Sequence, residues 1–389
     1  MPQALLGWEL GGGLGHLARL RPIAARLLAA GWKVHLASPR RGSASHMFRD
    51  LAGRWPAGLT LGPAPRAAPA AEPMATDTLA DVLALHGYGE TGRLLPIAAG
   101  WQRLLDRLTP ELIVADYTPA LCLVARGQAR LVTIGSGFTV PPLVDPLPPI
   151  RPWDEAVPDI SLERERRVLA VCTAIARANG LQRPECVAAL LHGDATFPCC
   201  LPLLDPYGRR RMVPTHMAYA DAIPRAPVPW GERPSRSVLV YLPDQHPLTA
   251  VLGQCLTDHL RPASPAGYAA DLSQAVAAAR LVVHHGGLGT AQAALLAGTP
   301  QLILPTHLED HITARALTRL GVAVALSATG PTSPEQITQA LRVLRAEPVA
   351  TAALSTARAA RSVLDGGDTL DAIMAACPHR RRAFACHSR

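Results

Sequence analysis

The chain has 389 residues, too many for one compact core, so two domains are expected. Hydrophobic residues make up 49% of the chain and aromatic residues only 4%, so aliphatic side chains must form most of the core. The net charge of +8 does not indicate nucleic-acid binding, because the arginines are scattered and Lys33 is the only lysine.

Cellular location is constrained by three absences in the sequence. No apolar run approaches the roughly 20 residues that span a bilayer. No basic segment precedes an apolar stretch at the N-terminus, so no secretory signal is visible. Eight cysteines without CxxC spacing favour reduced thiols over a disulfide framework. The sequence therefore predicts a cytoplasmic protein without a transmembrane segment.

The N-terminus predicts a strand, a turn, a helix and a second strand. Residues 4–8 form an apolar run, residues 9–15 a glycine-rich loop, residues 16–30 a mostly helical stretch and residues 33–37 another strand. Pro22 lies inside the helical stretch, where it is expected to kink the helix or restart its first turn.

The same alternation continues further along the chain. Apolar runs at residues 112–116 and 131–134 predict two more strands, with a short helix at residues 119–126 between them. This order predicts a parallel, doubly wound sheet across roughly the first half. Residues 56–73 and 141–158 are rich in proline and are predicted to be irregular.

Four segments follow from these patterns. We expect a first Rossmann-like domain at residues 1–221, a proline-rich linker at 222–236 and a second Rossmann-like domain at 237–376. Residues 377–389 contain three consecutive arginines among cysteines and histidines, but the Cys/His spacing matches no common zinc pattern. We therefore predict a flexible basic tail there rather than a metal site.

The most informative motif in the second half runs from His285 to Thr290, in the sequence His-Gly-Gly-Leu-Gly-Thr. An apolar strand precedes it at residues 279–283, and residues 290–297 predict a helix that starts within the motif. Such a turn directs free backbone N–H groups and the positive end of a helix dipole at one point, which suits a phosphate. An ordinary tight turn between a strand and a helix is the alternative.

Together the motifs resemble a known family. His285 to Thr290, then Ala-Gly-Thr-Pro at residues 297–300, then Glu309-Asp310, are similar to the donor-binding signature of the UDP-glycosyltransferase superfamily, and most resemble its bacterial antibiotic and macrolide branch. His16, at the end of a Gly-Leu-Gly-His motif, and Asp116 fall 100 positions apart, where that family keeps its catalytic pair. The resemblance implies the GT-B fold, an α/β class with two Rossmann-like domains facing a central cleft.

The resemblance also implies roles for these residues. His16 would act as the base that deprotonates the acceptor, and Asp116 would orient its ring. His285, Gly286, Gly287, Gly289 and Thr290 would hold the donor diphosphate, without a metal, because no Asp-x-Asp motif is present. Glu309 and Asp310 would hold the sugar hydroxyls, although they could instead cap the helix predicted at residues 312–320.

Several features of the ligands stay open. The family has glutamine where this chain has Asp310, which leaves the sugar unassigned. Residues 262–268 are expected beside the nucleobase, which is uracil or thymine. His246 follows the strand predicted at residues 237–241, and it either approaches the donor or lies on the surface. Ser136 and Phe138, in a loop that leads into Pro141-Pro142, are the expected acceptor contacts.

The predicted function is therefore an inverting, metal-independent glycosyltransferase of the hexosyltransferase type. It would move a sugar from a UDP- or dTDP-sugar to a small or medium-sized acceptor, with no cofactor and no nucleic-acid partner. Two alternatives are a sugar-nucleotide 2-epimerase of the same fold and a non-catalytic nucleotide-sugar-binding partner protein. The sequence leaves the oligomeric state open, a homodimer included.

Overall fold

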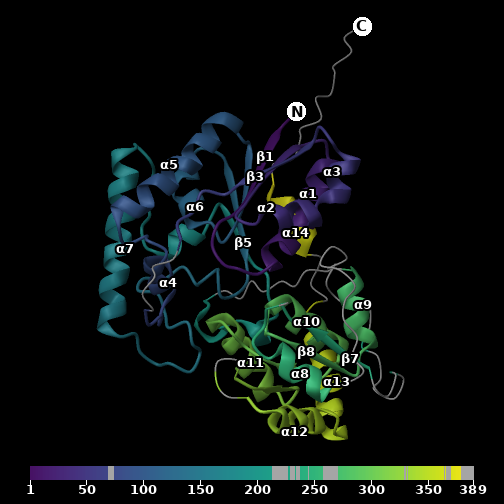
Figure 1. Ribbon diagram of the computed structural model, residues 1–389. Helices are drawn as coiled ribbons and strands as arrows, with labels where there is room; N and C mark the ends of the chain where they lie inside the picture. The colour runs from purple at the N-terminus through teal and green to yellow at the C-terminus, as the bar shows by residue number, and fades with distance from the viewer. Residues whose placement is uncertain are drawn as a thin grey trace.

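The computed structural model describes residues 1–68, 74–212, 227, 233, 237–243, 245–256, 270–327, 330, 332–362, 364 and 369–377. Most of the predicted linker at 222–236, the predicted nucleobase loop at 262–268 and the tail from residue 378 onwards lie outside the described residues. Figure 1 shows a first domain, drawn in purple to teal, above a second drawn in green to yellow.

A six-stranded parallel sheet in the order β3-β2-β1-β4-β5-β6 forms the first domain. This confirms the predicted doubly wound sheet. Its strands are β1 (Gln3–Trp8), β2 (Lys33–Ser38), β3 (Leu59–Pro63), β4 (Leu112–Asp116), β5 (Arg130–Gly135) and β6 (Ala195–Pro198). Its helices are α1 (Gly15–Ala29), α2 (Arg41–Met47), α3 (Arg49–Arg54), α4 (Leu79–Leu85), α5 (Thr91–Leu108), α6 (Pro119–Ala125) and α7 (Asp159–Ala178).

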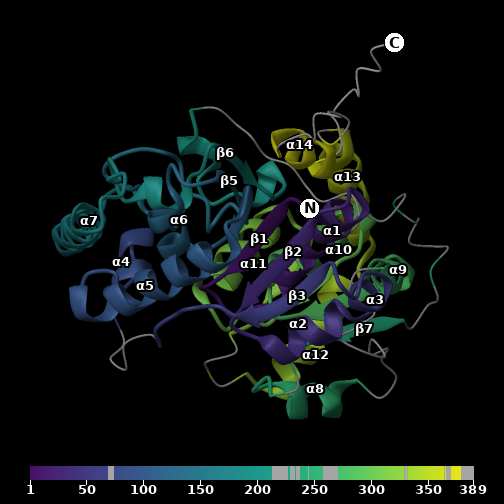
Figure 2. The same cartoon turned by 90° about the horizontal axis from the view of Figure 1, so that it is seen from above.

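Helices cover both faces of this sheet (Figure 2). The apolar residues of α1, α2 and α3 share one buried cluster with one face of the strands. The apolar residues of α4, α5, α6 and α7 share another cluster with the opposite face. The central strands β1, β2, β4 and β5 are buried on both sides and are mostly apolar runs, as is typical of parallel sheets, whereas the edge strands β3 and β6 are only partly buried. Helix α1 runs through Pro22 without interruption.

The second domain contains a four-stranded parallel sheet in the order β10-β9-β8-β7. Its strands are β7 (Val238–Tyr241), β8 (Leu281–His284), β9 (Gln301–Ile303) and β10 (Ala323–Ala325). The helices around it are α8 (Thr249–Cys255), α9 (Ala270–Ala278), α10 (Leu288–Ala297), α11 (Leu308–Arg319), α12 (Pro334–Leu344) and α13 (Glu347–Ser362). Within the described helices, none combines the length and the apolar character needed to cross a membrane.

The last helix, α14 (Thr369–Ala376), returns to the first domain, beside α1 in Figure 1. Leu370 and Ile373 belong to the buried cluster that contains the apolar side of α1. The Arg130 side chain donates to the Ala376 carbonyl oxygen at 3.1 Å. The sequence placed this segment in the second domain, but its apolar stripe packs on the first.

Two regions differ from their sequence-based interpretation. Residues 56–73 were expected to be irregular, yet β3 lies within them and pairs with β2 at the edge of the sheet. Strand β6 was not expected at all, because it is short and ends in Pro198. Pro198 is tolerated there because β6 is an edge strand, where a missing N–H costs no ladder hydrogen bond.

Candidate active site

The structure brings His16 and Asp116 together at the carboxyl ends of two neighbouring strands. Strands β1 and β4 pair in parallel with Trp8 opposite Asp116, so the loops that follow them meet. His16 lies in the first turn of α1, and its Nδ1 is 2.8 Å from Asp116 Oδ1. The carboxylate is fully buried and the histidine nearly so. An ionised carboxylate only accepts hydrogen bonds, so this contact favours a proton on Nδ1 and a free lone pair on Nε2. The Arg19 guanidinium also approaches Nδ1, with its Nη2 at 3.0 Å.

The surroundings of the ring fix its orientation. The Trp8 ring stacks on the His16 ring, with centroids 4.9 Å apart and planes 19° apart. Gly11 has φ +87°, and a Cβ there would lie 2.7 Å from His16 Nε2. A side chain at this position would therefore be strained and would block the free ring nitrogen. Glycine is needed in this loop to keep Nε2 accessible.

Arg19 completes the cluster, and the sequence analysis missed it. Its Nε lies 2.8 Å from Asp116 Oδ2 and its Nη2 lies 3.0 Å from Oδ1, a bidentate pair. Burial by itself would raise the pKa of Asp116, but Arg19 and His16 together hold that pKa below its ordinary value. The sequence could have indicated Arg19 by its spacing, because residues three apart on a helix, such as His16 and Arg19, lie on the same face.

The buried side chain of Glu9 connects the glycine-rich loop to three residues elsewhere in the first domain. The carboxylate is fully buried and accepts hydrogen bonds from the Tyr88 hydroxyl, from Trp101 Nε1 at 3.2 Å and from the Ala120 N–H at 3.3 Å. These donors come from outside the loop, and Ala120 lies in the first turn of α6, the helix that follows Asp116. Burial raises the pKa of Glu9 to about 8, against the effect of these hydrogen bonds.

Glu9→Gln is expected to flatten the pH dependence of stability. A carboxyl whose pKa rises on folding stabilises the fold below the unfolded value of 4.5, and this contribution is lost as pH rises towards about 8. The wild-type melting temperature should therefore fall across this window, and it should fall less in Glu9→Gln. Thermal melts from pH 5 to 8 measure this, with Glu90→Gln, an exposed position, as the control. Equal slopes for wild type and Glu9→Gln would contradict the assignment.

The second part of the site is the turn between β8 and α10. Gly286 has φ +109°, and a Cβ there would contact Asp310, so glycine is required. The Gly286 N–H donates to His284 Nδ1 at 3.1 Å, and His284 Nε2 lies 2.9 Å from Gln301 Oε1. The Gly286 amide is thus already engaged, which corrects the expectation that all amides from 286 to 290 are available. His284 was missed because it forms the buried end of the strand.

Beyond Gly286 the turn keeps the features of an anion site. Helix α10 begins at Leu288, and the first amides of a helix have no partner within it. His285 is partly buried, and its Nδ1 has no hydrogen-bond partner. Burial lowers the pKa of His285, so the ring is neutral. A Cβ at Gly287 would lie 2.8 Å from His285 Nε2, whereas a Cβ at Gly289 would meet open space.

Glu309 and Asp310 were both expected to hold the sugar hydroxyls, but their side chains have different surroundings. The Glu309 side chain lies close enough to Ser136, Arg19 and His16 of the first domain for these groups to lower its pKa. Burial nevertheless raises its pKa above the ordinary value. Asp310 Oδ2 accepts from the His307 N–H at 3.1 Å and caps α11. A donor-binding role for Asp310 therefore rests on the resemblance alone.

The predicted acceptor residues lie at the contact between the domains. Ser136 is 2% exposed and Phe138 is 8% exposed. Phe138 belongs to the same buried cluster as Ile312 of α11. Thr290, predicted to bind the donor, is also buried, at the start of α10. The roles of these residues stay predictions.

His246 does not lie on the surface, and neither of its ring nitrogens is free to contact the sugar donor. It is 5% exposed, its Nε2 lies 3.0 Å from the Leu304 carbonyl oxygen, and its Nδ1 accepts from the Leu248 N–H at 3.2 Å. Both ring nitrogens are therefore engaged, and His246 fixes the loop after β7 against the end of β9.

A comparison with known protein families finds a match in the second half of the chain. Residues 269–363 match the family of the erythromycin biosynthesis protein CIII-like C-terminal domain. This range contains the glycine turn, α10 and α11. The family match and the geometry of the turn therefore concern the same segment.

Two curated glycosyltransferases are similar in sequence to parts of this chain. Elloramycin glycosyltransferase ElmGT from Streptomyces olivaceus is 40% identical over 84 residues, which cover 22% of this chain and 19% of the relative. A PGL/p-HBAD biosynthesis glycosyltransferase from Mycobacterium tuberculosis is 26% identical over 279 residues, which cover 61% of this chain and 64% of the relative. The chain thus matches less than two thirds of the length of either protein.

Solved structures match over nearly the whole chain. CalG4, the calicheamicin glycosyltransferase, has a TM-score of 0.62 at 17% identity and covers 96% of this chain and 98% of its own. Glycosyltransferase VinC in complex with dTDP has a TM-score of 0.60 at 19% identity and covers 96% of this chain and 99% of its own. The chain therefore has the GT-B fold, and its residues 269–363 are similar to the erythromycin CIII-like C-terminal domain.

Proposed function

We propose that this protein is an inverting glycosyltransferase that moves a sugar from a nucleoside diphosphate to a small or medium-sized acceptor. The observation that carries the proposal is the His16–Asp116 contact at 2.8 Å, with His16 Nε2 beside Gly11. Glu309 of the second domain lies in the field of the same histidine. The proposed base and the proposed sugar-binding residue therefore lie close together where the two domains touch.

The proposed reaction is a single displacement at the anomeric carbon. His16 Nε2 takes the proton of the acceptor nucleophile while the nucleophile forms its bond to that carbon. The bond from the carbon to the diphosphate oxygen breaks, and its electron pair leaves with the nucleoside diphosphate. Asp116 stabilises the imidazolium that forms, through the Nδ1 contact. Attack opposite to the leaving group inverts the configuration.

The leaving diphosphate is proposed to rest on the β8–α10 turn. The first turn of α10 offers amides and the positive end of its dipole, and His285 offers a neutral ring nitrogen. These groups stabilise negative charge without a metal ion. The donor is a UDP- or dTDP-sugar in this proposal, and two similar structures, VinC and a spinosyn rhamnosyltransferase, were solved with dTDP.

The two alternative functions are less well supported. A 2-epimerase needs several carboxylates around the sugar ring, and Asp310 is engaged in capping its own helix. A non-catalytic binding partner would not need a buried His–Asp contact that leaves Nε2 accessible. Incubation with a panel of UDP- and dTDP-sugars distinguishes the three. Release of nucleoside diphosphate supports the transferase, an epimerised nucleotide sugar the epimerase, and binding without turnover the partner protein.

His285→Ala is expected to weaken the binding of nucleoside diphosphates by about 1.5–3 kcal/mol, because a hydrogen bond to a charged phosphate is lost. Isothermal titration with UDP and dTDP measures this. His46→Ala, on α2 of the first domain, is the control and should bind as wild type does. Unchanged affinity in His285→Ala would show that the diphosphate lies elsewhere.

Activity is expected to survive excess EDTA. The proposed cradle uses amides, a helix dipole and a histidine, so removal of divalent cations leaves it intact. Turnover is measured with and without EDTA, and again after magnesium is restored. Loss of activity with EDTA and recovery with magnesium would show that this cradle is not sufficient.

A further inference from the structure

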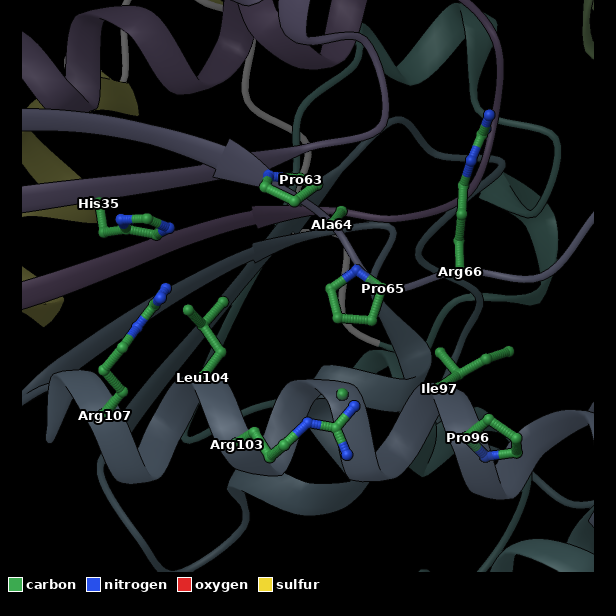
Figure 3. Close-up of a pocket in the computed structure, with 11 residues that line it drawn as sticks. His35, Pro63, Ala64, Pro65, Arg66, Pro96, Ile97, Arg103, Leu104 and Arg107 are labelled. Carbon is green, nitrogen blue, oxygen red and sulfur yellow. The ribbon is translucent and has the colours of Figure 1, made fainter.

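A cavity of about 570 Å³ lies in the first domain, between α5 and the edge of the sheet at β2 and β3 (Figure 3). Its lining does not include His16, Asp116 or any residue of the second domain. The sheet side of the lining consists of His35 of β2 and Pro63 at the end of β3. The cavity is therefore a separate feature from the candidate active site.

Three arginines line this cavity: Arg66, Arg103 and Arg107. All three are exposed, and within the described residues none has an ion pair or a hydrogen bond to an acceptor. Arg103 and Arg107 are four apart on α5, a spacing at which like charges destabilise a helix. No carboxylate lines the cavity to offset this charge.

His35 provides a second, independent observation. It is 9% exposed and lines the cavity, and its Nε2 has no hydrogen-bond partner. Its Nδ1 lies 2.8 Å from Thr60 Oγ1. Burial, assisted by the charge of Arg107, lowers the pKa of His35 to about 4, so the ring is neutral. If Thr60 donates to Nδ1, the proton lies on Nε2, where it is an unsatisfied donor at the cavity floor.

The remaining walls are apolar. Apart from Gly100, the other lining residues are Pro63, Ala64, Pro65, Pro96, Ile97 and Leu104. Figure 3 shows Pro96, Ile97 and Leu104 on the helix, and Pro63 and Pro65 at and just after the end of the strand. Guanidinium groups bind carboxylate, sulfonate and phosphate oxygens well, whereas prolines and aliphatic side chains bind apolar surface. The lining thus combines an anion-binding part with an apolar part.

We propose that this cavity is a second ligand site, which binds an amphiphilic organic anion. The acid group lies between Arg103, Arg107 and His35, and the apolar body lies along the prolines and Ile97. The cavity volume suits a ligand of drug-like size, since such pockets span roughly 300–1,000 Å³. This site does not depend on the proposed transfer reaction, and it can bind its ligand whether or not the protein is a transferase.

The test uses two fluorescent probes, the anion 8-anilinonaphthalene-1-sulfonate and its neutral analogue N-phenyl-1-naphthylamine. In Arg103→Gln/Arg107→Gln, the affinity for the anionic probe is expected to fall about tenfold or more, because two charge-assisted contacts are lost. The affinity for the neutral probe should change little. Glutamine is a good helix former, so α5 is retained. Arg319→Gln/Arg358→Gln removes the same charge from exposed positions of the second domain and should bind both probes as wild type does.

Competition separates this site from the donor site. Saturating UDP should leave the binding of the anionic probe intact if the probe occupies the cavity. Displacement of the probe by UDP, or equal affinities of the Arg103/Arg107 variant and the Arg319/Arg358 control, would overturn the proposal. The Arg103/Arg107 variant should also keep wild-type sugar transfer, so failure of the proposed function is measured independently.

Discussion

His16→Ala is expected to lower kcat by about 10²–10⁴-fold, the contribution of a positioned general base. Nucleoside diphosphate affinity should stay nearly unchanged, because His16 lies on the first domain and the phosphate turn on the second. Trp8 stacks on the His16 ring and would face a small void in the variant. The measurement is steady-state turnover with a nucleotide sugar, together with calorimetric binding of UDP and dTDP.

The matched control for this experiment is His46→Ala. His46 lies on α2, where its Nδ1 lies 3.5 Å from Arg49 Nη2, and no described hydrogen bond or ion pair links it to Asp116 or to the phosphate turn. It should retain wild-type turnover. If His16→Ala kept most of its kcat, His16 would not be the base. If it instead lost diphosphate affinity in proportion to kcat, the histidine would serve donor binding.

Asp116→Asn is expected to lower both turnover and stability. Turnover should fall less than in His16→Ala, because the base remains and only its orientation is disturbed. Stability should fall by about 3–5 kcal/mol, because Arg19, 13% exposed, loses its buried carboxylate partner. Urea unfolding at pH 7 measures this. Asp371→Asn, which removes an exposed partner of Arg26, should cost less than about 1 kcal/mol.

The difference between wild type and Asp116→Asn should depend on pH. The pKa of Asp116 is lower in the folded state than the unfolded value of 3.8. Its stabilisation is therefore fully present above that value and is lost as pH falls through the folded pKa. The two unfolding free energies should converge at acid pH. A double-mutant cycle with Arg19→Met tests the pair directly, and additive effects of the two changes would show that Arg19 and Asp116 do not interact.

Local patterns in the sequence were sufficient for much of the fold. The apolar runs that became β1, β2, β4, β5, β7 and β8 are each bounded by glycine, proline or polar residues, and parallel strands buried on both faces keep this pattern. The glycine positions of the β8–α10 turn were also readable, since Gly286 has a conformation that other residues rarely adopt. The pairing of His16 with Asp116 was inferred from family resemblance, and the structure places the two in contact.

Apart from the His16–Asp116 pair, which the family resemblance supplied, contacts between distant segments could not be read from the sequence. Arg19 is one of many scattered arginines until α1 places it over Asp116, 97 positions away. The hydrogen bonds of Glu9 connect the glycine-rich loop after β1 to Tyr88, Trp101 and Ala120. No local sequence pattern relates these three residues to Glu9. Helix α14 crosses to the first domain because its apolar stripe completes that core. In each case burial and charge pairing in the tertiary structure determine which residues are in contact. No periodicity along the chain predicts these contacts.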